Sequence, residues 1–205
     1  MYIPAHFAQT DVEAIHGLMT VSNFATIVTA PGGTPLATHV PLVLDRVGAN
    51  GRLRGHLARP NPQLQCFDVQ HEALVIFQGP HAYISPAWYV TAPAVPTWNY
   101  AVVHAYGKPA VREDAEWLRR LLEDLVAQHD QTWRLSDVPD KYLADLSRGI
   151  VGFEMDIDRL EAKWKLNQHR PEGDRLGPAA ALERQPDTTS HQLAALMRSI
   201  APVGE

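Results

Sequence analysis

Polar and aromatic side chains gather at three places in the sequence, each at or near the end of an expected strand. A flat aromatic cofactor with a phosphate tail needs such groups, because its ring stacks on aromatic side chains and its heteroatom edge takes hydrogen bonds from amides. Arg, Lys and a helix N-terminus bind its phosphate. In chain order, the three sets are His56, Arg59 and Asn61; Thr97, Trp98 and Asn99; and Lys165, Gln168 and Arg170. Further polar and aromatic residues of this kind are Ser85, Trp88 and Tyr89 near another strand end, and Lys163 and His169 beside Lys165. The composition of these sets suits FMN.

Each of these residues also has a simpler interpretation. A tryptophan in a strand is more often a core or dimer contact, and a single Lys or Arg is usually solvated. Successive side chains of a strand point to opposite faces, so Trp98 and Asn99 cannot both contact a ligand by side chain unless a bulge intervenes. The residues alone therefore suggest a ligand wall without identifying the ligand.

Several familiar kinds of site are not expected from this sequence. It contains no GxGxxG, GxxxxGK, HExxH or GxSxG motif, which argues against a nucleotide-binding α/β fold and a serine hydrolase. The histidines of the strand region lack the short spacing of a local metal site, so we expect no metal. The formal charge of -5 and the absence of a basic recognition helix give no sign of where DNA would be contacted.

Cysteine content and hydropathy bear on the expected location. One cysteine, Cys66, allows no internal disulfide, which fits a reducing compartment. No basic leader with a long apolar run and no stretch of about 18 apolar residues is seen. We therefore expect a soluble cytoplasmic protein with no membrane contact.

The elements that must position the three sets are mainly short strands. Period-two patterns between Gly- and Pro-rich turns predict an antiparallel barrel or sandwich with added helices, an α+β fold. An apolar stripe predicts a helix over 113–130, and a shorter helix over 139–149 is expected to end at Gly149. Asn61 followed by Pro62 predicts a short helix after the first polar set. The expected strands are 23–30, 36–44, 52–58, 72–79, 82–89, 97–107 and the first half of 150–166, with a terminal helix over 188–200.

Five motifs in order resemble the PaiB family of FMN-binding negative transcriptional regulators. They are MYIPAHF, GHLARPNPQ, VIFQGPHAYISPAWY, VPTWNYAVVHAYG and KLNQHR, and the similarity runs from Met1 to about Ala181. The family more often has a small residue at the position of Pro60, and a KLSQNR-like string where this chain has Asn167 and His169. Pro60 removes one backbone donor near the expected phosphate site.

The resemblance implies a split β-barrel that works as a homodimer with FMN at the subunit interface. It implies residues 1–170 as the FMN-binding domain, with inserted helices at about 112–148, and a C-terminal helical extension over 171–205. By position, His56, Arg59 and Asn61 would grip the phosphate, Thr97, Trp98 and Asn99 would border the ring, and Lys165, Gln168 and Arg170 would close the pocket.

Three functions follow from the resemblance. The first is an FMN-binding repressor or sensor, with possible DNA contact through the dimer. The second is an FMN-dependent oxidoreductase that takes hydride from NAD(P)H, in which the cofactor carries the chemistry. The third is a haem-binding protein, suggested by distant split-barrel relatives and the ten histidines.

Overall fold

The computed structural model describes residues 1–200. Both strands and helices are present, as expected for an α+β fold. The α-helices are α1 (Val12–Val21), α2 (Ala115–His129), α3 (Asp140–Ser147), α4 (Glu172–Leu182) and α5 (Thr188–Ser199). The strands are β1 (Ala8–Gln9), β2 (Phe24–Thr29), β3 (Leu36–Pro41), β4 (Val43–Asp45), β5 (Arg52–Ala58), β6 (Ala73–Ile84), β7 (Thr97–Gly107), β8 (Ala110–Arg112) and β9 (Ile150–Lys165).

The strands follow the order β3-β2-β6-β7-β9-β5-β4, with β1 and β8 also paired to β9. Neighbouring pairs such as β2 with β3 and β5 with β9 are antiparallel, and His56 of β5 lies opposite Gly152 of β9. β9 is a continuous strand of 16 residues, so the extended conformation predicted for its first half runs through Lys165. This strand carries Lys163 and Lys165 to the site described below.

Two of the expected strands are in fact one. β6 runs from Ala73 to Ile84 through Gly79 and Pro80, where we expected a break, and the short 3-10 helix η4 (Pro86–Trp88) follows it. β2 pairs with β6 only from Leu74 to Ile76 in the described register. Pro80 lies beyond this pairing, so no hydrogen bond to β2 requires the backbone N–H that proline lacks, and the strand can continue.

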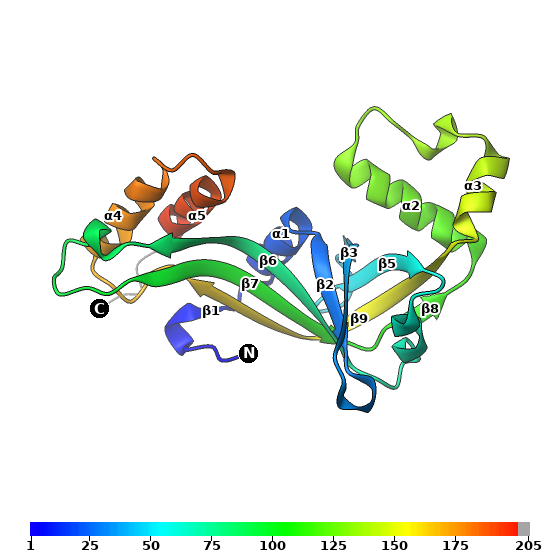
Figure 1. Ribbon diagram of the computed structural model, residues 1–205, viewed down its shortest axis with the longest axis horizontal. Coiled ribbons are helices and arrows are strands. Elements are labelled where there is room, and N and C mark those ends of the chain that lie inside the picture. Colours follow the sequence, from blue (N-terminus) through cyan, green and yellow to red (C-terminus); the bar gives the residue numbers. More distant parts are fainter. Residues whose placement is uncertain (201–205) are drawn as a thin grey trace. The chain divides into compact units, whose positions relative to one another are not determined.

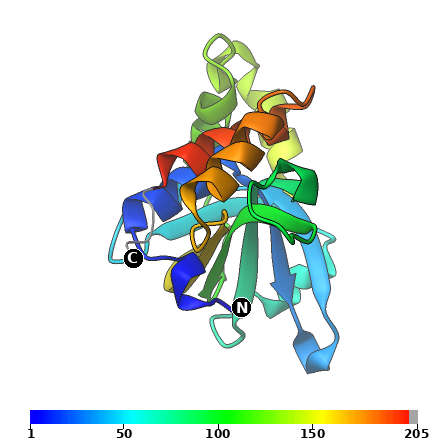
Figure 2. The ribbon, with the colours of Figure 1, turned by 90° about the vertical axis from the view of Figure 1, so that its left-hand side faces the viewer.

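The chain divides into two compact units, which are described separately. The first comprises residues 1–15, 78–103 and the chain from 161 onward. Within it, α4 and α5 lie side by side over the β6 and β7 segments, and η1 (Ala5–Phe7) leads into β1 (Figures 1 and 2). Leu182, Leu193 and Met197 of α4 and α5 are fully buried and form the core of this unit.

The second unit comprises residues 16–77 and 104–160. Its largest buried side chains include Leu53, Phe77 and Phe153. α2 begins at its N-cap Asp114, whose carboxylate accepts from the backbone N–H of Trp117, and it buries its apolar stripe against β4 and the start of β9. The helices expected near 113–130 and 139–149 are therefore α2 and α3.

No helix among residues 1–200 is long and apolar enough to cross a lipid bilayer.

Candidate functional site

Lys163 and Lys165 are at the centre of a cationic cluster in the first unit. Lys165 Nζ donates to the carbonyl oxygen of Trp98 at 2.8 Å and to Thr97 Oγ1. Lys163 Nζ donates to the carbonyl oxygen of Tyr2 at 3.2 Å and lies 5.5 Å from the ring centre of Tyr100. Two of the predicted sets, those of Thr97 and of Lys165, are therefore in contact.

The charge of this cluster is not balanced. Within residues 1–200 neither lysine pairs with a carboxylate, since the partners of both are neutral oxygens and aromatic rings. Burial, and then the charge of Lys163, lower the pKa of Lys165 below its usual range. His169 is exposed, and its pKa is lowered by partial desolvation first and then by the charges of His6, Arg170 and Lys165. We call Lys163, Lys165, His169 and Arg170 the basic set.

Arg170 is the member of the basic set that has an anionic partner. Its guanidinium lies 4.5 Å from the ring centre of Tyr89 and pairs with Asp174 at 3.3 Å. Asp174 is 1% exposed and accepts the backbone N–H groups of Val90 and Thr91, each at 2.9 Å. Burial opposes ionisation of Asp174, but these hydrogen bonds and Arg170 outweigh it, so the pKa of the carboxyl lies below its usual range.

Trp98 supplies an aromatic surface beside the basic set. It is 54% exposed, with Tyr83 in an edge arrangement at 6.3 Å between ring centres and His81 at the same distance. A hollow of about 310 Å³ is lined by Gln78, His81, Trp98, Tyr100, Ala101 and Val102. Trp98 is therefore a surface residue of the described chain and not part of its core.

Asn99 and Gln168 point inward. Asn99 is 0% exposed, and its amide donates to Met197 Sδ at 3.6 Å, while Trp98 faces outward. The predicted alternation of the two residues is thus confirmed. Gln168 accepts from the N–H of Leu166 and donates to the carbonyl oxygen of Trp164, which holds the turn after β9 in place.

The remaining predicted residues lie in the second unit. Arg59 donates to the carbonyl oxygens of Arg148 and Ile150 at 2.9 and 3.2 Å and pairs with Glu113 at 2.9 Å. Asn61 caps the 3-10 helix η3 (Pro62–Cys66), as predicted, because its side chain accepts from the N–H of Gln63. Its amide also donates to Thr38 Oγ1 at 3.1 Å.

His56 is half-buried on β5. Its Nδ1 is buried without a hydrogen-bond partner among the described residues, and burial lowers the pKa of the ring. A neutral imidazole is favoured there. Six of the nine predicted residues thus lie in the first unit, and His56, Arg59 and Asn61 lie in the second.

Four contributors to the cluster were not among the predicted site residues: Tyr2, Lys163, Tyr89 and Asp174. Lys163 and Tyr89 were noted among the polar residues at strand ends without being chosen as site residues, and Lys163 shares a face of its strand with Lys165. Asp174 follows Arg170 by four residues, a spacing that brings side chains together at a helix start. Tyr2 comes from a distant segment and left no such signal.

Comparison with known proteins matches residues 1–159 to a family described as "Putative FMN-binding domain". The chain is 38% identical over 200 residues to "Protease synthase and sporulation protein PAI 2" of Bacillus subtilis, covering 96% of both chains. Conserved hypothetical protein Rv2991 of Mycobacterium tuberculosis has a similar structure, with a TM-score of 0.60 and 13% identity over 84% of this chain and 95% of that one.

The FAD and haem binding protein of Mycobacterium smegmatis also shares the fold, with a TM-score of 0.55 and 19% identity over 77% of this chain and 72% of that one. At such identities the two structures bear on the fold alone, and they agree with the predicted α+β split barrel. The family model and the Bacillus relative carry more weight, because both extend over most of the sequence. The chain belongs to the PaiB family of FMN-binding split-barrel proteins.

Proposed function

We propose that this protein is an FMN-dependent regulator or sensor in which the basic set binds an anionic part of the cofactor. FMN is the cofactor of the family to which the chain belongs. The observation that carries the proposal is the uncompensated charge of Lys163 and Lys165. A phosphate dianion beside two ammonium groups relieves their repulsion and forms charge-assisted hydrogen bonds.

The residues present fit the two ends of FMN. The basic set supplies donors for the phosphate, and the exposed face of Trp98 supplies a surface for ring stacking. FMN supplies hydride and single-electron chemistry wherever it is bound. The chain's own part is to bind, to orient and to set the local charge: Lys165 would direct the anion toward the Thr97–Trp98 segment, and Asp174 would hold Arg170 in position.

The predicted residues of the second unit, His56, Arg59 and Asn61, would contribute to the FMN site from the other copy of a dimer. The family resemblance implies FMN between two copies of the chain. Arg59 has three of its five N–H groups engaged, so two are available for a phosphate oxygen. We propose that each FMN takes contacts from His56, Arg59 and Asn61 of one copy and from Thr97, Trp98 and Lys165 of the other. Asn99, Gln168 and Arg170 would support that surface from within.

The regulatory part of the proposal is supported by the name of the Bacillus relative, which refers to protease synthesis and sporulation. Contact with DNA would then have to come from a basic surface shared by the dimer, because the chain has a net charge of -5. We place the protein in the cytoplasm, since Cys66 is a free buried thiol.

The test begins with the absorption spectrum of the purified full-length protein. We expect flavin bands, and release by heat of a compound identified as FMN. A colourless protein that also fails to bind added FMN would overturn the proposal. A Soret band with release of haem would replace it with the haem-binding function.

Turnover separates a regulator from an enzyme. The FMN-loaded protein is mixed with NADH or NADPH and an acceptor, and operator binding is measured at physiological salt. Regulation predicts sequence-specific DNA binding without sustained NAD(P)H oxidation. Sustained oxidation without sequence preference on DNA would favour the oxidoreductase.

A further inference from the structure

A cavity in the second unit lies apart from the basic set. It measures about 500 Å³, is partly open to solvent, and is bounded by α2, α3, the beginning of β9 and Arg59. This volume is within the range of small-molecule pockets in proteins. All of its lining residues belong to residues 16–77 and 104–160, so the second unit builds it alone.

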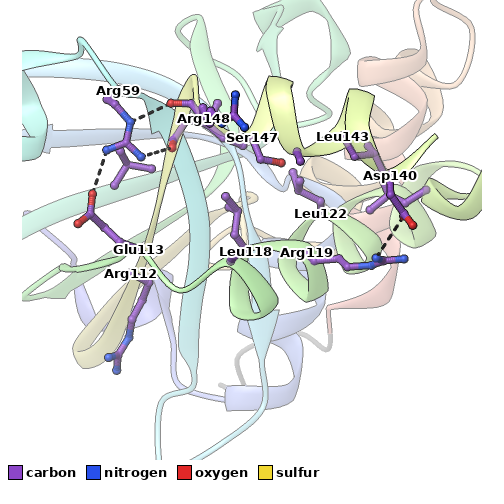
Figure 3. Close-up of a pocket in the computed structure, with 15 residues that line it drawn as sticks. Arg59, Arg112, Glu113, Leu118, Arg119, Leu122, Asp140, Leu143, Ser147 and Arg148 are labelled. Atoms are coloured by element: carbon purple, nitrogen blue, oxygen red, sulfur yellow. Dashed lines mark hydrogen bonds and ion pairs between the residues drawn. The ribbon is translucent and has the colours of Figure 1, made fainter. Parts of the chain in front are cut away.

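The cavity is lined by aliphatic side chains along its length and by charges at its ends. In Figure 3, Leu118 and Leu122 point from α2 toward α3, with the Arg59–Glu113 pair at one end and the Arg119–Asp140 pair at the other. None of the lining residues in the described chain is aromatic. The aliphatic members are Ala115, Leu118, Leu122, Leu135, Leu143, Ala144, Ile150 and Val151.

Helix α3 does not pack into this space. It buries none of its eight residues, and Tyr142 and Leu146 are each 58% exposed. Its polar contacts are exposed ion pairs, such as Lys141 with Asp145, which contribute little to stability. The cleft is partly open to solvent, so an apolar ligand would remove the aliphatic part of its lining from water.

Arg59 gives one end of the cavity a fixed cation. The carbonyl oxygens of Arg148 and Ile150 and the carboxylate of Glu113 orient its guanidinium and use three of its five N–H groups. The other two have no partner among the described residues. A planar guanidinium with free donors suits a carboxylate.

We propose that this cavity binds a medium-chain aliphatic monocarboxylate, with its carboxylate at Arg59 and its alkyl chain between α2 and α3. An unbranched alkyl chain matches the aliphatic lining, whereas a flavin would find no aromatic surface there. The ligand would complete the packing beneath α3. This carboxylate would use the two N–H groups of Arg59 that the proposed function gives to the FMN phosphate, so the acid and FMN would compete for Arg59. The site would thereby let an aliphatic acid regulate flavin binding.

Calorimetric titration of the full-length protein with hexanoate, octanoate and decanoate tests this. Saturable binding of one acid per chain is expected, with affinity rising about fourfold for each methylene buried. 1-Decanol, which lacks the carboxylate, should bind at least about tenfold more weakly than decanoate. No saturable binding, or binding independent of chain length and head group, would overturn the proposal.

Variants on α3 locate the binding. Leu143→Trp fills the cavity and should weaken decanoate binding at least about tenfold, whereas Leu146→Trp, on the exposed side of the same helix, should leave it unchanged. Ala144→Leu is a smaller filling change that serves if Leu143→Trp fails to fold. Equal effects of the filling and control variants would refute the site. Arg59 stays in place in all variants, and flavin content is recorded separately, so a failure here is distinct from a failure of FMN binding.

Discussion

Lys163 and Lys165 extend from the same face of β9, two residues apart, and both donate to uncharged oxygens. Ordinary surface lysines lie near carboxylates or water. Here burial and mutual repulsion disfavour the charged form of Lys165, as the lowered pKa indicates. Under the proposed function, a bound anion would offset this repulsion.

Replacing Lys165 by methionine should weaken FMN binding about 10- to 150-fold, because a charged hydrogen bond is worth about 1.5 to 3 kcal/mol. Titration by flavin fluorescence measures the change. Riboflavin, which lacks the phosphate, should lose much less affinity if Lys165 contacts the phosphate. Lys141→Met, an exposed lysine of α3, is the control. Equal FMN affinity of the Lys165→Met and Lys141→Met proteins would exclude Lys165 from the site.

Mixing two defective variants tests the shared dimer site. If each FMN needs Arg59 from one copy and Lys165 from the other, Arg59→Gln and Lys165→Met proteins should each bind FMN poorly. A refolded equimolar mixture should regain tight binding, because half of the chains then form mixed dimers with one intact site each. Analytical ultracentrifugation monitored at the flavin absorbance measures the FMN bound to dimers. The mixture should bind about a quarter as much FMN as the wild-type protein. No recovery in a mixture that does form dimers would mean that one copy supplies both residues.

His169 should make the protein less stable in mild acid. Its folded-state pKa is below the unfolded value, so between these two pKa values the unfolded chain binds more protons and stability falls as the pH falls. Urea unfolding at pH 7.5 and 5.5 should show that His169→Gln removes part of this loss. His191→Gln, which changes another exposed histidine that lies on α5 and outside the basic set, should retain it. The same pH dependence in wild type and His169→Gln would contradict the prediction.

Two glycines should respond in opposite ways to alanine. A Cβ at Gly177 of α4 would lie 2.4 Å from the carbonyl oxygen of Trp88, so Gly177→Ala should destabilise the protein by about 1 to 3 kcal/mol. A Cβ at Gly17 of α1 meets nothing within 4 Å. Gly17→Ala should therefore stabilise by about 0.5 to 1 kcal/mol through helix propensity. Thermal unfolding of both variants measures the two effects, and a stabilised Gly177→Ala protein would show that α4 packs differently.

Short sequence patterns correctly predicted those features of the fold that depend on neighbouring residues. The cap at Asn61 and the opposite faces of Trp98 and Asn99 followed from neighbouring residues alone. α4 had no such signal, because Gly177 and Pro178 are poor helix formers. Its helix is held by tertiary contact with η4, which no window of sequence contains.

The site shows the same division. The residue types at strand ends and the order of the motifs indicated which segments would supply the cationic and aromatic side chains. They could not indicate that Arg59 is engaged by Glu113 or that Asn99 and Gln168 turn inward, since these outcomes depend on segments far apart in the chain. Likewise, only the folded structure shows that Lys165 pairs with none of the carboxylates among residues 1–200.

The carboxylate of Asp174 receives two backbone N–H groups from the loop after η4 and one from Arg170. This one buried carboxylate thus connects the Val90–Thr91 loop and the end of the KLNQHR motif to the first turn of α4. A chain shortened at residue 170 would release both segments together. The first turn of α4 therefore sets the position of Arg170, whereas Lys163 and Lys165 are positioned by β9 and would keep their contacts without it.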